Sequence, residues 1–271
     1  MDTMGLLLLL IFISMLVPSA QFNLNTNKAT VAASRRFDMT MGAVLTQTSL
    51  RVENLKRSIA FYKNCLGMSV ISEGETFACV GYDGSKQLEL SVDSTKKLSI
   101  GNAFSGIGIR TPKAPDVFSS AQENGGSVEV ELSDFAYAAS QIPDEDEMKS
   151  FPVRYGRLSD PDGYSVEVHE GAEQSITKAV LNVLDLEQSI GFYENLGLCL
   201  LRKRSNVMSK PKEASICAYM GDTSEGKAYI ELVYKYATTK LDLGNGFLEL
   251  TIKGGREGET LDPNGYSISF S

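Results

Sequence analysis

The sequence is poor in the residues on which several common kinds of functional site depend. It has one histidine, His169, which excludes a three-histidine zinc site and a relay between two histidines. Its four cysteines include no Cys-x-x-Cys pair, so we interpret them as reduced thiols and not as a zinc or disulfide scaffold. GxGxxG, Walker and GxSxG motifs do not occur, which excludes the phosphate-binding loops and the nucleophile elbow that these motifs form.

Positive charge is also in deficit. The chain of 271 residues has 26 lysines and arginines against 34 aspartates and glutamates, a net charge of −8, which argues against a nucleic-acid partner or an anionic membrane surface. Hydrophobic residues make up 42% and charged residues 22%, ordinary values for a globular chain of one or two domains. The acidic run at residues 144–147 lacks EF-hand spacing, and we interpret it as a solvated loop.

The first residues have the composition of targeting segments. Residues 5–17 form an apolar run that suits a signal peptide and is short for a membrane span, which needs about 20 residues. Residues 21–36 contain three basic residues and no acidic one, as in an organellar transit peptide. We therefore expect residues 1–41 to be a signal and transit presequence that directs the protein to a plastid through the secretory pathway. The alternatives are secretion and a buried N-terminal helix. No later segment could span a bilayer, so we expect no membrane contact after processing.

The remainder of the chain contains an internal repeat. Residues 50–64 (LRVENLKRSIAFYKN) recur as residues 181–195 (LNVLDLEQSIGFYEN), and residues 160–167 (DPDGYSVE) recur as residues 262–269 (DPNGYSIS). Each copy begins with an alternating β-rich stretch and continues with apolar residues at helical spacing. The Asp-Pro-Asx-Gly turn near the end of each copy starts an alternating strand. The repeat therefore predicts two similar halves.

The elements of the two halves predict an α+β fold of repeated βαβββ units. We expect a first domain at residues 42–171 and a second, truncated domain at residues 175–271. Only a few residues separate the strand predicted at 247–253 from the turn at Asp262, whereas the corresponding interval of the first half holds a whole helix, predicted at 116–124, and a strand. The last unit should lack these elements, which leaves a sheet edge that is open, covered or used by a partner.

In the order and spacing of its motifs, the chain resembles the glyoxalase I (lactoylglutathione lyase) family of the vicinal oxygen chelate superfamily, in its duplicated form. The segments that carry the resemblance are residues 47–52 (QTSLRV), 58–62 (SIAFY), 66–68 (LGM), 88–90 (LEL), 160–164 (DPDGY) with Glu167, 200–204 (LLRKR) and 230–236 (IELVYKY). The resemblance implies an enzyme that isomerises the hemithioacetal of methylglyoxal and glutathione to S-lactoylglutathione. It also implies a divalent metal, Ni, Zn, Co or Mn, that stabilises the enediolate formed when a carboxylate removes a carbon-bound proton.

The resemblance assigns roles to individual residues. Gln47 matches the family's first metal ligand, Glu89 the second, and Glu167 the fourth, which is also the catalytic base; we expect catalysis to depend on Glu89 and Glu167. Gly106 stands where the third ligand should be a histidine, so we expect weak metal binding that Gly106→His would strengthen. Arg51 matches the arginine that binds the glutathione carboxylate, a role that suits a guanidinium group.

The second half carries its own set of matching positions. Lys178 stands at the first-ligand position, Glu231 at the second, Glu249 at the third and Ser269 at the fourth. In the family each metal site takes two ligands from each of two paired units. The two sites implied are Gln47, Glu89, Glu249 and Ser269, and Lys178, Glu231, Gly106 and Glu167. The first lacks a base, and the second places an ammonium group where a ligand should be, which would compete with a cation.

A different pairing of the units stays open at this point. If the units pair within the first half, Gln47, Glu89 and Glu167 would share one site. His169 lies two residues after Glu167 on the same strand face, and it could then approach the gap at Gly106.

Two classes of function follow from these residues. The first is a glyoxalase I-like lyase that acts on a glutathione adduct. The second is a catalytically degenerate member of the superfamily that acts as a small-molecule binding or assembly module, because one fold can host unrelated functions. The retained ligands favour the lyase, while the missing histidine and the truncated last unit favour the binding module.

Overall fold

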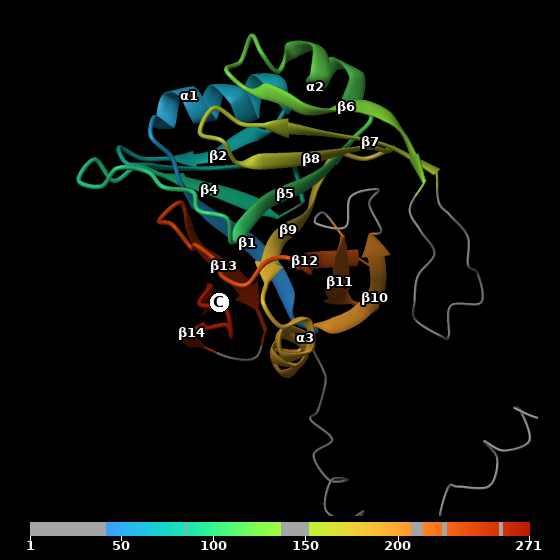
Figure 1. Cartoon of the computed structure of the whole chain (residues 1–271). Coiled ribbons are helices and arrows are strands. Elements are labelled where there is room, and N and C mark those ends of the chain that lie inside the picture. The colour runs from blue at the N-terminus through green and yellow to red at the C-terminus, as the bar shows by residue number, and fades with distance from the viewer. Residues whose placement is uncertain (1–41, 85, 137–151, 207–213, 224–226, 255–256) are drawn as a thin grey trace, which may run out of the picture. The chain divides into compact units, whose positions relative to one another are not determined.

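The computed structural model describes most of the chain after residue 41. The described residues are 42–84, 86–136, 152–206, 214–223, 227–254 and 257–271. The expected presequence at residues 1–41 and the acidic run at residues 144–147 lie outside them. The described residues form two mixed sheets with helices packed against them (Figure 1), which confirms the predicted α+β fold. None of the helices in this part of the chain has the length and apolar character needed to cross a membrane.

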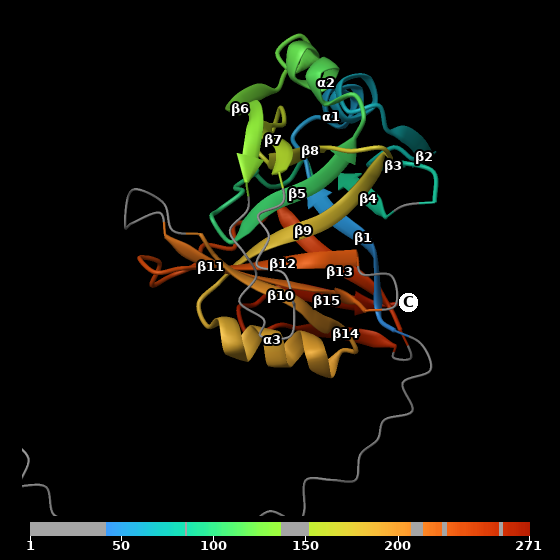
Figure 2. The same ribbon diagram turned by 90° about the vertical axis from the view of Figure 1, so that its right-hand side faces the viewer.

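Sheet A joins the beginning of the described chain to its end. Its strand order is β14-β15-β13-β1-β4-β3-β2. The strands are β1 (Val44–Arg51), β2 (Ser69–Glu73), β3 (Phe77–Gly81), β4 (Gln87–Ser91), β13 (Phe247–Lys253), β14 (Gly258–Leu261) and β15 (Ser267–Phe270). The join is made by β1 and β13, which pair antiparallel and lie side by side in both views (Figure 1, Figure 2).

Sheet B is formed by the middle of the chain. Its strand order is β10-β11-β12-β9-β5-β8-β7-β6. The strands are β5 (Phe104–Thr111), β6 (Ser127–Ala136), β7 (Pro152–Ser159), β8 (Ser165–Glu170), β9 (Ser175–Val183), β10 (Cys199–Asn206), β11 (Ser215–Asp222) and β12 (Lys227–Lys235). Its two halves meet where β5 pairs antiparallel with β9.

The strands fall into four units, and each unit of the first half pairs with a unit of the second half. Unit 1 (β1 to β4) shares sheet A with unit 4 (β13 to β15), and unit 2 (β5 to β8) shares sheet B with unit 3 (β9 to β12). The alternative pairing within the first half is therefore wrong. Each sheet draws on both predicted domains, and the boundary between residues 171 and 175 stays a prediction.

The helices begin at equivalent positions in the two halves. Asn54 caps α1 (Leu55–Ala60) by accepting a hydrogen bond from the Arg57 amide, and Asp185 caps α3 (Leu186–Asn195) in the same way. Within the helices, Tyr62 and Tyr193 are fully buried, as the repeat predicts for equivalent core positions. The two halves thus share their helix as well as their strands.

The first helix continues into a π-helix, η1 (Phe61–Cys65), which has no counterpart in α3. The first copy reads FYKNCLG and the second FYENLG, so the first has one additional residue, Cys65, before the shared Leu-Gly. A π-helix accommodates such an insertion within a helix. The Cys65 thiol donates to the Val117 carbonyl of α2 (Ala114–Ser120), at 3.4 Å. The inserted residue therefore joins the two helices of the first half.

The last unit is shorter than the others, as predicted. Among the described residues it has β13, β14 and β15 but no equivalent of α2. In the first half, α2 contacts η1 and lies beside α1 in Figure 1, whereas α3 packs against β10, β11 and β12 (Figure 2). Strand β14 forms the edge of sheet A, where Leu261 is 64% exposed. A partner at this edge stays a prediction.

Two linkers, residues 92–103 and residues 236–246, carry the chain between the sheets, and their backbones hydrogen-bond to each other. The Asn102 amide donates to the Asp242 carbonyl at 2.8 Å, and the Asn245 amide donates to the Ser99 carbonyl at 2.7 Å. This close approach requires glycine in each linker. Gly101 and Gly244 have φ of +70° and +59°, and a Cβ at either would lie 2.1 Å from a carbonyl oxygen of the other linker.

We expect Gly101→Ala to lower the free energy of unfolding by about 2 kcal/mol or more, because it adds both a strained backbone conformation and a contact with a carbonyl oxygen. Chemical denaturation measures this loss. The control is Gly84→Ala, since Gly84 has a similar φ of +69° with no atom within 4 Å of the added Cβ. Equal losses in the two variants would mean that contact between the linkers contributes nothing.

Candidate functional site

The first candidate site lies on one face of sheet A. Ser49 of β1 pairs with Glu89 on one side and with Glu249 on the other, so the two carboxylates flank β1 at the same level. Gln47, two residues earlier on the same face, donates from its amide nitrogen to Glu89 Oε2 at 3.1 Å. Ser269 hydrogen-bonds to Glu249. The structure thus brings together the four residues Gln47, Glu89, Glu249 and Ser269.

Negative charge accumulates at this site. Burial raises the pKa of Glu249, and the charges of Glu259 and Glu89 raise it further, while the hydrogen bond from Ser269 opposes the shift. The charges that act on Glu249 are therefore those of two other carboxylates. A cation bound here would relieve this repulsion.

The second candidate site lies on sheet B and already contains a cation. The ammonium of Lys178 in β9 lies 2.8 Å from Glu167 Oε2 in β8 and also contacts Glu231 of β12. Lys178 and Glu231 are buried, with side chains 8% and 7% exposed. Burial alone would raise the pKa of Glu167, but Lys178 and the neighbouring His169 more than offset this and hold that pKa well below its usual range.

The backbone at the expected third-ligand position excludes a side chain. Gly106 has a φ of +143°, and a Cβ there would lie 2.0 Å from the carbonyl oxygen of Ser165 on β8. The expectation that Gly106→His would strengthen metal binding is therefore wrong, because histidine cannot occupy this position without moving β8.

His169 lies beside the sheet B residues and not beside Gln47 and Glu89. Its Nε2 is 3.9 Å from Glu167 Oε2, and its ring lies 5.1 Å from that of Tyr155. The histidine therefore adds a neighbour to Glu167 and does not complete a site on sheet A.

Arg51 lies on the same strand face as Gln47 and is only partly neutralised. Its side chain is 12% exposed, and Nη2 lies 3.7 Å from Asp93 Oδ2. Nε and Nη1 are buried and have no hydrogen-bond partner within the described residues. Since buried guanidinium nitrogens are normally satisfied, the group is suited to bind an anion.

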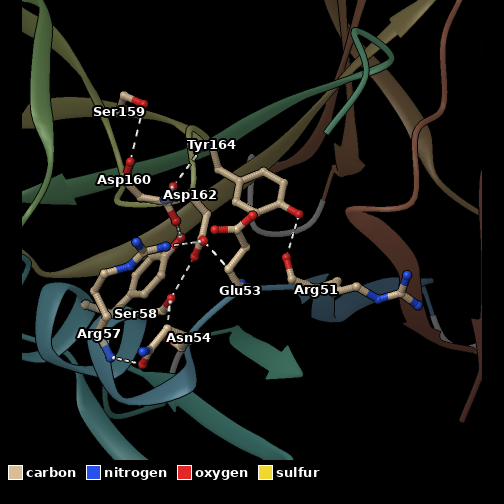
Figure 3. A network of polar contacts seen from close by, with 10 residues as sticks. Arg51, Glu53, Asn54, Arg57, Ser58, Ser159, Asp160, Asp162 and Tyr164 are labelled. Atoms are coloured by element: carbon tan, nitrogen blue, oxygen red, sulfur yellow. Dashed lines mark hydrogen bonds and ion pairs between the residues drawn. The ribbon is translucent and has the colours of Figure 1, made fainter. Parts of the chain in front are cut away.

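The end of β1 is held by a polar network that the sequence indicated only as a turn. Tyr164 donates from its hydroxyl to the Arg51 carbonyl at 2.7 Å, and Asp162 accepts from the Glu53 amide and the Ser58 hydroxyl (Figure 3). Behind this turn, buried Asp160 accepts hydrogen bonds from the Tyr164 amide and, among others, the Tyr62 hydroxyl. The network fixes the strand end that carries Arg51.

The buried carboxyl of Asp160 makes stability depend on pH. Burial raises its pKa to about 6 despite its hydrogen bonds. The raised pKa means that the folded state binds the Asp160 proton more tightly than the unfolded state does. The free energy of unfolding therefore contains its full contribution from this proton below about pH 4. It loses about 3 kcal/mol as the pH rises through about 6. We expect Asp160→Asn to lack this part of the decrease in unfolding free energy between pH 4 and pH 7, as measured by urea denaturation. Asp83→Asn, at an exposed carboxylate, is the control and should follow the unmodified protein. Parallel pH curves for the Asp160 variant and the unmodified protein would contradict the prediction.

The donor chemistry of the two sites differs in its fit to a divalent metal. Among the described residues, no three His, Cys, Asp or Glu side chains gather as a metal site. Sheet A nevertheless offers two carboxylates with an amide and a hydroxyl, which are oxygen donors that octahedral cations accept. Sheet B does not fit a metal, since the ammonium of Lys178 lies between its carboxylates.

Comparisons with known proteins agree on one family. Residues 44–168 match the family model described as the Glyoxalase/Bleomycin resistance protein/Dioxygenase superfamily. A probable chloroplastic lactoylglutathione lyase of Arabidopsis thaliana is 30% identical over 221 residues, which cover 74% of this chain and 57% of that protein. A rice lactoylglutathione lyase is also 30% identical over 221 residues, covering 74% of this chain and 69% of its own length. The chain thus spans little more than half of the Arabidopsis relative.

Solved structures agree on the fold. The crystal structure of glyoxalase I from Zea mays superposes with a TM-score of 0.69 at 22% identity, covering 84% of this chain and 92% of the maize chain. The order of strands and helices described above is therefore that of a known fold.

Proposed function

Since this chain belongs to the glyoxalase/bleomycin resistance protein/dioxygenase superfamily, we propose that it is a glyoxalase I-like lyase that isomerises the hemithioacetal of methylglyoxal and glutathione to S-lactoylglutathione. The relatives named lactoylglutathione lyase support this proposal. The observation that carries it is the group of oxygen donors on sheet A, where Gln47 bonds to Glu89 and the charge of Glu89 acts on Glu249.

The residues proposed to hold the metal are Gln47, Glu89, Glu249 and Ser269. Their oxygens suit Ni, Zn, Co or Mn, and the metal, when bound, supplies a Lewis acid for the oxygens of the substrate. Gln47 would present its amide oxygen in place of the nitrogen that faces Glu89, which a half-turn of the amide provides. Glu89 and Glu249 supply the negative charge that retains the ion.

Glu249 is proposed as the group that accepts the substrate's proton. It is the second carboxylate of the sheet A site, level with Glu89 across β1, and a general base must lie within reach of the proton that it removes. Glu167 is the base that the family resemblance implies, but its ion pair with Lys178 stabilises its charged form and weakens it as a base. The replacement Glu167→Gln distinguishes the two candidates, because it should leave turnover intact if Glu249 is the base and abolish turnover if Glu167 is.

Arg51 is proposed to bind a carboxylate of the glutathione part of the substrate. Its Nε and Nη1 lack partners within the described chain, and a substrate carboxylate would supply an acceptor to this group. The substrate would then bind with its reacting carbons near Glu89 and Glu249 and with the carboxylate of its glutathione part near Arg51.

One observation favours a second function, a small-molecule binding module without catalysis. Ser269 stands at the fourth position on sheet A, where the family has its catalytic carboxylate, and a hydroxyl cannot accept the proton as a carboxylate does. If Glu249 does not replace that base, the site would bind its ligand without converting it.

A turnover assay tests the two functions. Purified protein is incubated with methylglyoxal, glutathione and Ni²⁺, Zn²⁺, Co²⁺ or Mn²⁺, and S-lactoylglutathione is measured. We expect that product forms only when metal is added and that the Gln47→Ala variant forms none. Binding of S-lactoylglutathione without turnover would identify the binding module.

A plastid location is proposed as well. The name of the Arabidopsis relative includes the word chloroplastic, which supports a plastid for this chain. Passage through the secretory pathway, with removal of residues 1–41, is the finer proposal. N-terminal sequencing of the mature protein tests it, and a mature chain that begins near Met1 would contradict it.

A further inference from the structure

Sheet B repeats the strand register of sheet A around its first two site positions, with a different residue at the first of them. Glu89 pairs with Ser49, two residues after Gln47, and Glu231 pairs in the same parallel manner with Val180, two residues after Lys178. Lys178 therefore occupies the position that Gln47 occupies on sheet A.

The surroundings of Lys178 are built to hold an ammonium group. Two carboxylates from different strands, Glu167 and Glu231, contact its Nζ, and the face of the Tyr219 ring lies 5.5 Å from it. The stem of the lysine passes over Gly108, where a Cβ would come within 2.8 Å of the lysine Cγ and Cε. On sheet A, the corresponding partner of Gln47 is Thr251. The glycine thus leaves room for a side chain longer than glutamine.

Charge explains why this ammonium excludes a metal ion. A buried carboxylate and a partly buried one need a compensating cation, and Lys178 supplies it through a covalently attached group that cannot diffuse away. A divalent ion at the same place would have to lie against the ammonium, and the repulsion between the two at a few ångströms is strong in a buried environment.

We propose that the ammonium of Lys178 takes the place of a divalent metal ion on sheet B, so that this chain holds a metal ion on sheet A only. The exclusion of the ion from sheet B rests on the contacts of Lys178, and the ion on sheet A rests on the function proposed above. Lys178→Gln removes the cation and provides an amide beside Glu167 and Glu231, which creates three oxygen donors of the kind found on sheet A.

Calorimetric titration with Ni²⁺ and with Mn²⁺ counts the ions bound per chain. We expect Lys178→Gln to bind one ion more than the unmodified protein. The matched control is the double variant Lys178→Gln with Glu231→Gln, which lacks the second carboxylate and should return to the unmodified count. A folded Lys178→Gln variant with an unchanged count would overturn the proposal.

A second measurement remains decisive if Lys178→Gln does not fold. Glu231→Gln in the unmodified background leaves the ammonium paired with Glu167, and we expect it to leave the number of bound ions unchanged. A lower number would show that Glu231 ligates a metal and would overturn the proposal. If the unmodified protein binds no ion and Lys178→Gln binds one, the proposed metal site on sheet A is wrong while the role of Lys178 holds.

Discussion

Glu89→Gln is expected to lower the rate of S-lactoylglutathione formation by about 100-fold or more, because it removes one of the two charged oxygens proposed to retain the metal ion beside the base. Gln keeps the size of the side chain and its contact with Gln47, so the fold should survive. Steady-state rates at saturating Ni²⁺, with Ni²⁺ affinity measured separately, check both parts of the expectation.

The control for this variant is Glu73→Gln, an identical change at an exposed position in β2 of the same sheet. It should retain the unmodified rate. If Glu89→Gln also retained that rate and its Ni²⁺ affinity, the proposed site on sheet A would be wrong and the chemistry would have to lie elsewhere.

The second large effect concerns stability. Lys178→Met should lower the free energy of unfolding at pH 7 by about 3–5 kcal/mol, the usual cost of leaving buried charges without their partner. Two carboxylates, Glu167 and Glu231, would then repel each other. The deficit should shrink as the pH falls from about 4.5 to about 2, because the unmodified protein loses over this interval the stabilisation that the low pKa of Glu167 provides.

Lys203→Met provides the comparison, since Lys203 also pairs with a glutamate, Glu187, but at the surface, where the glutamate side chain is 73% exposed. Exposed pairs contribute about 0–1 kcal/mol, so this variant should be nearly as stable as the unmodified protein. Similar decreases in the free energy of unfolding of both variants at pH 7 would mean that the ion pair on sheet B stabilises the protein no more than an exposed ion pair does.

Much of the fold could be predicted from the repeat. Equal spacing placed Tyr62 and Tyr193 at the same core position, and the structure buries both beneath a carboxyl group, that of Asp160 or Asp262. The strand predicted at 247–253 has those bounds. The helix predicted at 116–124 instead spans Ala114–Ser120, and Pro115 is tolerated in its first turn, where no amide donor is needed.

The site could be predicted from the sequence only where the type of side chain by itself decides the chemistry. Lys178 could be recognised as a cation among carboxylates from its position in the repeat. The positive φ of Gly106 could not, because a glycine in a strand reads the same whether or not its backbone excludes a side chain. The π-helix could have been predicted from the sequence, because aligning the two copies of the repeat shows that the first has one additional residue, Cys65.

The pairing of β1 with β13 has a consequence for the order of folding. Thr46 bonds to Thr251, 205 residues away, whereas sheet B consists of one continuous stretch of chain from Phe104 to Lys235. Contacts between distant residues form late, because a long loop must close first. We expect pulse-labelled hydrogen exchange during refolding to protect the amides that pair β9 with β12 before those that pair β1 with β13. On the ribosome, β1 then waits with one edge unpaired until nearly the whole chain has been made, and closure of sheet A is the last step.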